Sequence, residues 1–333
     1  MPILHRYAHA CGPSLAESYW VGLRYDDQYG FDHRRMESWV LGPPAPGSQI
    51  PTPILTRLGR MTELWRSPSG HAFVPAFSGA IHHIYPAPRS TGERWRTEAL
   101  KGVLSGAWGL SDNLVMVFGE DGFTGEHPTH VMYMWDGGRW RLIPSPGQVN
   151  GMDGASPDLI YAVGHEGLIA RWDGGAWQRI ASPTTTSLNR VVIVDENEMY
   201  AAGPGRRLLL GSIYGWTEVL VAPFDIHGLA RVGDTVYVSS AHGGLWTLKD
   251  GQLVPAKAKV DAERITSAPR TPTPSAATSG PAKILATTAQ AIVELTNELE
   301  TARVDIGGFI WLSNRQPPLF RMNQKLGAPP ART

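Results

Sequence analysis

The stretch that decides the fold is Trp172-Asp173-Gly174-Gly175-Ala176-Trp177, which has a close copy at Trp135-Asp136-Gly137-Gly138-Arg139-Trp140. In each copy an Asp-Gly-Gly turn separates two tryptophans. Aspartate caps such a turn with its carboxylate, and glycine supplies the positive φ that a tight hairpin needs. We therefore expect each copy to be a β-hairpin, with its tryptophans packed between neighbouring sheets.

The residues before the second copy extend this hairpin into a larger unit. Residues 159–164 and 168–172 are two strand-like segments separated by a short Gly-containing turn, and residues 177–180 follow the Asp-Gly-Gly turn. Residues 149–152 offer a further short strand ahead of them. Four antiparallel strands in about 40 residues are typical of one blade of a β-propeller.

The same plan recurs along much of the chain. Four tryptophans at matching places, Trp95, Trp140, Trp177 and Trp216, are 45, 37 and 39 residues apart. A degenerate copy of the turn lies at residues 249–251, and residues 283–304 again alternate between strand-like segments and a turn. This regularity predicts a single all-β propeller domain over residues 1–333.

The two ends of the chain decide how the ring closes. Residues 19–24 and 36–41 are strand candidates in an N-terminal extension (residues 1–50), and residues 309–312 are a candidate near the C-terminus. Because an open ring would expose sheet edges, we expect both ends to share one composite blade. The prediction is seven four-stranded blades, with six as the alternative. Residues 267–282, rich in Pro, Thr and Ser, are predicted to be a long loop within a blade.

Composition narrows the class of protein. The 333 residues include 37 Gly, 27 Pro and 12 Trp, only 18% are charged, and the net charge is zero. A neutral chain is not expected to bind nucleic acid, which requires a basic surface. A single cysteine, no apolar leader segment and no run of about 20 apolar residues predict a cytoplasmic protein that has no contact with the membrane.

The repeat also resembles a known kind of sequence. Residues 161–164 (Tyr-Ala-Val-Gly) and the two Trp-Asp-Gly-Gly turns resemble degenerate bacterial propeller repeats of the kelch and WD-repeat kind, over roughly residues 57–260. The resemblance implies the propeller architecture. It carries no catalytic or binding residue over to this chain.

Catalytic and metal-binding motifs are not found in the sequence. There is no P-loop and no G-x-S-x-G elbow, and Cys11 is expected to be an unreactive free thiol although His9 is two residues away. His82 and His83 point to opposite faces of a strand, and Pro128 prevents a regular helix between His127 and His130. We therefore predict no catalytic residue, no metal site and no cofactor.

Loops that join the second and third strands of the blades lie on the same face of a propeller as the blade-to-blade connections. By the repeat register these loops carry a set of polar residues of mixed charge, which we call the rim and predict to bind a protein partner: Glu120, Asp121, His165, Glu166, Arg206, Arg207 and His242. The competing interpretation is that they are ordinary solvated hairpin tips.

These observations favour a non-catalytic function. We expect a monomeric protein-binding propeller that acts as a scaffold or an inhibitor, for example an immunity protein that neutralises a toxin. The alternative is an enzyme that hydrolyses or cleaves a glycan or small metabolite at the mouth of the central channel. Carboxylates or histidines that converge in the channel, including His165 or His242, would favour the enzyme, and a plugged apolar channel would favour binding.

Overall fold

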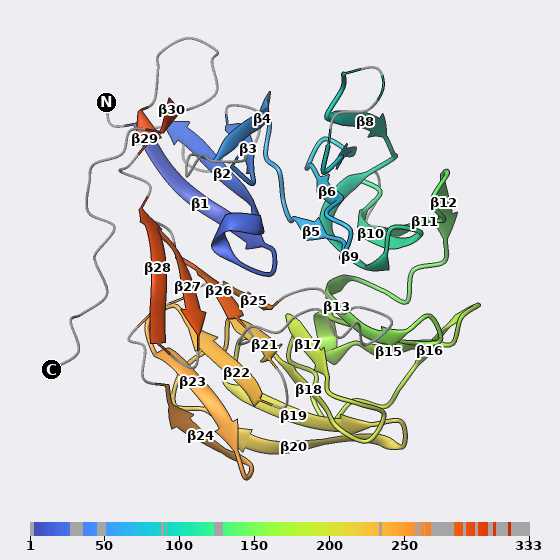
Figure 1. Ribbon diagram of the computed structural model, residues 1–333. Helices are drawn as coiled ribbons and strands as arrows, with labels where there is room; N and C mark the ends of the chain where they lie inside the picture. Colours follow the sequence, from blue (N-terminus) through green and yellow to red (C-terminus); the bar gives the residue numbers. More distant parts are fainter. Residues whose placement is uncertain are drawn as a thin grey trace, which may run out of the picture.

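The computed structural model describes residues 3–26, 36–44, 51–87, 90, 92–122, 129–232, 235–256, 260, 262, 264–267, 283–288, 291–296, 299–305, 309–310 and 319–320. Within them the chain forms seven four-stranded antiparallel sheets arranged in a ring (Figure 1). The prediction of a seven-bladed propeller is therefore confirmed, and the alternative of six blades is wrong.

The first four blades follow one another along the sequence. The first contains β1 (Ile3–Cys11), β2 (Tyr19–Asp26), β3 (Glu37–Gly42) and β4 (Thr52–Leu58), with the 3-10 turn η1 (Leu15–Glu17) between β1 and β2. The second contains β5 (Trp65–Arg66), β6 (Ala72–Pro75), β7 (Ala80–Ile84) and β8 (Trp95–Ala99). The third contains β9 (Val103–Ser111), β10 (Leu114–Glu120), β11 (His130–Trp135) and β12 (Trp140–Ile143). The fourth contains β13 (Val149–Ser156), β14 (Leu159–Gly164), β15 (Ile169–Trp172) and β16 (Trp177–Arg179), with the 3-10 turn η3 (His165–Gly167) between β14 and β15.

The remaining three blades repeat the same order. The fifth contains β17 (Arg190–Ile193), β18 (Met199–Ala202), β19 (Arg207–Ser212) and β20 (Gly215–Val221). The sixth contains β21 (Gly228–Val232), β22 (Thr235–Ser240), β23 (Gly244–Lys249) and β24 (Gln252–Pro255). The seventh contains β25 (Arg264–Ser267), β26 (Lys283–Thr287), β27 (Ala291–Thr296) and β28 (Leu299–Asp305). A short separate hairpin pairs β29 (Phe309–Ile310) with β30 (Leu319–Phe320).

The first strand of each blade lies toward the centre of the ring. Neighbouring first strands contact one another: β13 lies against both β9 and β17, and β21 lies against both β17 and β25. Apolar side chains fill the space between successive blades, and these layers form the hydrophobic core. The side chains of the first strands consequently meet around a central channel.

The two Asp-Gly-Gly turns adopt the predicted hairpin geometry. Asp136 Oδ1 accepts hydrogen bonds from the amides of Gly138 and Arg139, at 3.1 and 3.0 Å. Gly137 has a φ of 92°, which other residues rarely adopt. The second copy repeats these contacts around Asp173.

The tryptophans of the repeat are structural, as predicted. Trp135 pairs with Trp140 across the hairpin, with ring centroids 5.4 Å apart, and Trp172 pairs with Trp177 at the same separation. Trp172 is 4% exposed and lies in a core cluster with Met116 of the preceding blade. The repeated turn therefore belongs to the scaffold.

The predicted composite blade is wrong. All four strands of the first blade come from residues 3–58, and all four strands of the seventh come from residues 264–305. The N-terminal residues are thus a complete blade and not an extension that completes another. Residues 268–282 of the Pro/Thr/Ser-rich segment lie outside the described residues, and the strands on either side of them, β25 and β26, are paired in one sheet.

Side-chain packing closes the ring instead of shared strands. Buried residues of the first blade, among them Tyr7 and Trp39, share a core cluster with Leu285 and Ile292 of the seventh. Polar contacts cross the same seam: Thr266 Oγ1 donates to the carbonyl oxygen of Ala10 at 2.8 Å. This packing and this hydrogen bond join the two blades without a shared strand.

No helix in the described part of the chain is long and apolar enough to cross a membrane.

Candidate functional site

The rim residues lie where the sequence predicts them, at the connections between second and third strands. Glu120 is the last residue of β10 and Asp121 follows it, and His165 and Glu166 lie in η3. Arg206 directly precedes β19, of which Arg207 is the first residue, and His242 lies between β22 and β23. All except the half-buried Glu120 are exposed. The propeller topology brings these connections to one face, together with the blade-to-blade segments. Their role in binding stays a prediction.

Three of the rim side chains already have partners within the fold. Glu120 Oε1 accepts a hydrogen bond from Gln148 Nε2 at 2.8 Å, and Gln148 belongs to the connection to the next blade. Arg207 pairs with Glu218 of β20, the outer strand of its own blade. Arg206 Nη1 donates to the carbonyl oxygen of Pro223 at 3.3 Å. These three contacts brace the loops, and the side chain of Arg206 is nevertheless exposed.

Two rim residues have an unusual backbone conformation. Glu166 has a φ of 53° and Arg206 has a φ of 67°; Asp250 is the third residue other than glycine with a positive φ in the described part of the chain. A side chain in this region costs free energy that glycine avoids. Residues that keep such conformations are concentrated at functional sites. The rim therefore exposes one acidic and one basic side chain at tips where glycine fits better.

A second site lies in the central channel, where the structure contains a cavity of about 400 Å³. First strands, or the residues just before them, from all seven blades line this cavity. The lining is polar in part. Its ionisable side chains are His9, Cys11, Glu63, Asp153, Arg190, Arg231 and Arg264.

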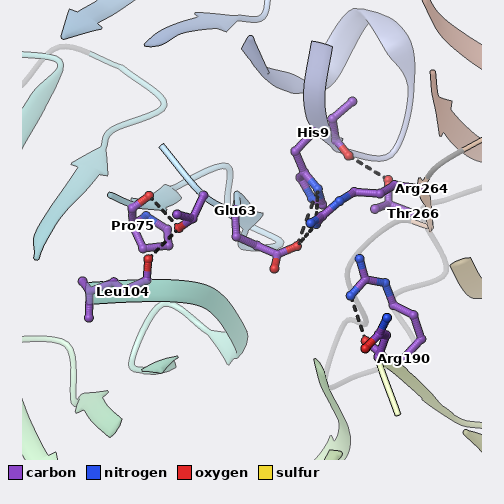
Figure 2. A network of polar contacts seen from close by, with 10 residues as sticks. His9, Glu63, Pro75, Leu104, Arg190, Arg264 and Thr266 are labelled. Carbon is purple, nitrogen blue, oxygen red and sulfur yellow. Dashed lines mark hydrogen bonds and ion pairs between the residues drawn. The ribbon is translucent and has the colours of Figure 1, made fainter. Parts of the chain in front are cut away.

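Three of these side chains form a network that joins three parts of the ring (Figure 2). Arg264, on the seventh blade, pairs with Glu63, which lies just before β5. The same guanidinium donates to Nδ1 of His9 at 3.1 Å, and His9 Nδ1 lies 3.6 Å from the Glu63 carboxylate. Because Nδ1 accepts this bond, His9 is neutral.

The electrostatics of the network follow from burial and from its arginines. Burial lowers the pKa of His9 to about 3, although the Glu63 carboxylate opposes this shift. Burial raises the pKa of Glu63, but Arg264, His9 and Arg190 lower it by more, so the pKa lies below its usual value. At neutral pH the network therefore contains a carboxylate, a neutral imidazole and one guanidinium group, with the Arg190 guanidinium acting on it from nearby.

This arrangement is unsuited to acid–base catalysis. A general acid or base at neutral pH needs a pKa near 7, and the pKa shifts of His9 and Glu63 both run away from that value. His165 and His242, the histidines considered for a channel-mouth enzyme, do not line the cavity. The channel is not plugged by apolar side chains, and Glu63, Asp153 and His9 converge in it. By the criterion drawn from the sequence this favours the enzyme alternative, whereas the pKa shifts of His9 and Glu63 argue against these two side chains as its acid and base.

Cys11 lines the same cavity and is buried. Burial raises the pKa of its thiol to about 11, against a weaker opposing effect from a hydrogen bond to the Arg66 backbone. We expect less than a tenth of the thiol to react with iodoacetamide at pH 7.5 in the time that labels the urea-unfolded chain fully, measured by mass spectrometry. Labelling of the native chain at the unfolded rate would contradict this.

The histidines of the second blade have protein partners. His82 Nδ1 lies 2.7 Å from Thr97 Oγ1, and His83 Nε2 lies 2.8 Å from His71 Nδ1. His82 and His83 therefore contact different residues, as their predicted opposite orientations require. His127 lies outside the described residues. No group of three or more potential metal ligands occurs among the residues that the structure describes.

Sequence reasoning did not find the channel network. Glu63, Arg190 and Arg264 lie in segments about 130 and 70 residues apart, and no motif links them. One weak signal was present: a charged residue at the start of a short apolar strand, as in Arg190 followed by Val191 and Val192. Only the closed ring brings these side chains together.

Comparison with known proteins supports the fold. The sequence matches no protein-family model and no curated protein. The structure is similar to the crystal structure of the WD40 β-propeller domain of Doa1, with a TM-score of 0.61 over 87% of this chain and 92% of that one. The two are 8% identical in sequence, so the likeness shows the fold alone. The resemblance to WD-repeat propellers is confirmed at this level, and the kelch and bacterial parts of it stay predictions.

Proposed function

We propose that this chain is a non-catalytic propeller that binds a protein partner through the rim, as a scaffold or as an inhibitor. The observation that carries the proposal is the pair Glu166 and Arg206, charged residues held at exposed tips in a conformation that favours glycine. A hairpin tip under selection for stability alone would gain from glycine at both positions.

The chemistry of the rim suggests the kind of partner. Acidic residues, arginines and histidines lie on the connections of four successive blades, so a partner of mixed charge can form several complementary polar contacts. Such contacts give specificity and fast association more than raw affinity. They suit an inhibitor that must recognise one target, such as a toxin, in the cytoplasm. The propeller is proposed to act as a monomer, because the rim of a single chain is enough to bind one partner.

A double substitution at the two tips tests this proposal. Glu166→Gly combined with Arg206→Gly removes both charges and relieves both backbones, so the folded state should keep its stability or gain up to about 1 kcal/mol. We expect the partner recovered from the native host with the unmodified chain to bind the variant at least tenfold more weakly, measured by surface plasmon resonance.

Asp250→Gly is the matched control. Asp250 has a φ of 49° in the turn between β23 and β24, which lies on the opposite face of the ring. This variant makes the same kind of backbone change and should leave the affinity within twofold of the unmodified chain. Equal affinity for the double variant, or an equal loss in Asp250→Gly, would rule out the rim as the binding surface.

A further inference from the structure

We propose that the central channel binds a small oxyanion, a metabolite that bears phosphate or carboxylate groups, between the guanidinium groups of Arg190 and Arg264. The site is separate from the rim, and the inference does not depend on the proposed protein partner. It rests on the cavity, on the balance of charge in its lining and on the position of Arg190.

The lining carries more cations than anions. Among the described residues that line the cavity, Arg190, Arg231 and Arg264 are guanidinium groups, whereas only Glu63 and Asp153 are carboxylates. His9 is neutral and does not alter the balance. The two carboxylates are already engaged, since Glu63 pairs with Arg264 and Asp153 Oδ2 accepts the amide of Ile193 at 2.7 Å.

Arg190 is the least compensated of these cations. Its Nη1 donates to the carbonyl oxygen of the adjacent Asn189 at 2.8 Å, and no ion pair within 4 Å involves it in the described part of the chain. Figure 2 shows its side chain extending toward the Arg264–Glu63 pair. Arg190 is half-buried, and a partly desolvated cation without a direct counter-ion is costly, so the folded chain gains when an anion lies beside it.

Electrostatics agree with this geometry. Burial and the repulsion of Arg264 lower the pKa of Arg190 to about 10, and Glu63 offsets only part of this shift. Arg264 acts on Arg60 too: burial first, and then the repulsion of Arg264 and Arg6, lower the pKa of Arg60. Several guanidinium groups thus act on one small region, and their mutual repulsion falls when an anion enters.

The cavity suits a ligand of this class. A guanidinium group presents a planar fork of N–H donors that matches the oxygens of phosphate and carboxylate groups. A volume of about 400 Å³ lies within the range of small-molecule sites and exceeds the need of a single ion. The Arg264 side chain is 27% exposed, so solvent and solutes reach the network. Glu63, which is 13% exposed, orients the Arg264 side chain through their ion pair.

Anion binding is tested with inorganic phosphate and with citrate, each compared with chloride at equal ionic strength and pH 7.5. We expect phosphate, citrate or both to raise the melting temperature saturably, because a ligand that binds only the folded state stabilises it. The comparison of the two anions shows whether phosphate or carboxylate groups fit better. Equal melting temperatures in all three salts would overturn the proposal.

Substitutions then locate the site. Arg190→Gln should weaken the binding of the effective anion at least tenfold by calorimetry, and Arg190→Lys should weaken it less because the charge remains. Arg139→Gln, on a side chain that is 77% exposed at a hairpin tip, is the control and should bind normally. The Glu166→Gly and Arg206→Gly variant should bind normally too, which separates this site from the rim. Unchanged affinity in Arg190→Gln would overturn the proposal.

A measurement on the unmodified chain covers the case in which an Arg190 variant fails to fold. Phenylglyoxal modifies accessible arginines, and mass spectrometry identifies the modified positions. We expect the effective anion to protect Arg190 and Arg264 at least fivefold while Arg139 stays equally reactive. Modification of Arg190 and Arg264 at the same rate with and without the anion would contradict the assignment.

Discussion

Replacing Trp39 by alanine is expected to lower the free energy of unfolding by about 3–5 kcal/mol, the cost of removing a large aromatic side chain from a packed core. Trp39 is 1% exposed, and its ring meets Tyr7 edge-on with centroids 5.7 Å apart. Both belong to the cluster that includes Leu285 and Ile292 of the seventh blade. The substitution therefore weakens the seam that closes the ring as well as one blade.

Urea unfolding followed by tryptophan fluorescence and circular dichroism measures this loss. Trp177→Ala is the matched control, because Trp177 lies on the outer strand of the fourth blade and is only partly buried. Its loss should cost about 1–2 kcal/mol, since less apolar surface is removed from the core. If Trp39→Ala cost no more than Trp177→Ala, packing across the seam would not be what closes the ring.

The repeat made most of the architecture predictable. Each blade contains strong local signals, such as the Asp173 turn and the strand that ends at Gly164, and these signals recur at nearly even spacing. The same signals predict strands over residues 283–304, and β26, β27 and β28 lie between Lys283 and Asp305. Turn residues and strand-forming segments determine the hairpins, and successive hairpins form the four-stranded blades.

Ring closure was mispredicted because β1 does not read as a strand in isolation. Ile3–Cys11 contains two histidines and an arginine among its apolar residues, so its periodicity is weak. Tyr7 and Ala10 are buried on the seam side, whereas His9 faces the channel network. The first strand of a blade packs against other parts of the protein on both of its faces. It can therefore contain polar residues where the channel offers them hydrogen-bond or ion-pair partners, and this obscures the alternation of apolar and polar residues. The seam and the channel both depend on residues over 250 positions apart, which sequence patterns do not relate.

Acid is expected to destabilise the protein well before its carboxylates titrate, with a loss of about 4 kcal/mol in the free energy of unfolding between pH 7 and pH 5. Burial lowers the pKa of His9 to about 3, and burial together with Arg57 lowers the pKa of His82 to about 4. In the unfolded chain both side chains titrate near 6.5. Between these values the unfolded state binds protons that the folded state does not, so stability falls as the pH falls.

The magnitude and its test follow from this difference. Each histidine contributes about 2 kcal/mol over the interval, because a shift of one pKa unit corresponds to about 1.4 kcal/mol.

Urea unfolding at a series of pH values measures how steeply the free energy of unfolding changes with pH. His9→Gln keeps an acceptor for Arg264, and His82→Gln keeps a polar partner for Thr97; each should remove about half of the slope, and the double variant most of it. His242→Gln, at the exposed rim, is the matched control and should leave the slope as it is. A double variant that loses stability between pH 7 and pH 5 as steeply as the unmodified chain would show that neither buried imidazole is responsible. A slope that is halved in the His9→Gln single variant would instead establish that the histidine beside Arg264 and Glu63 stays neutral in the folded chain.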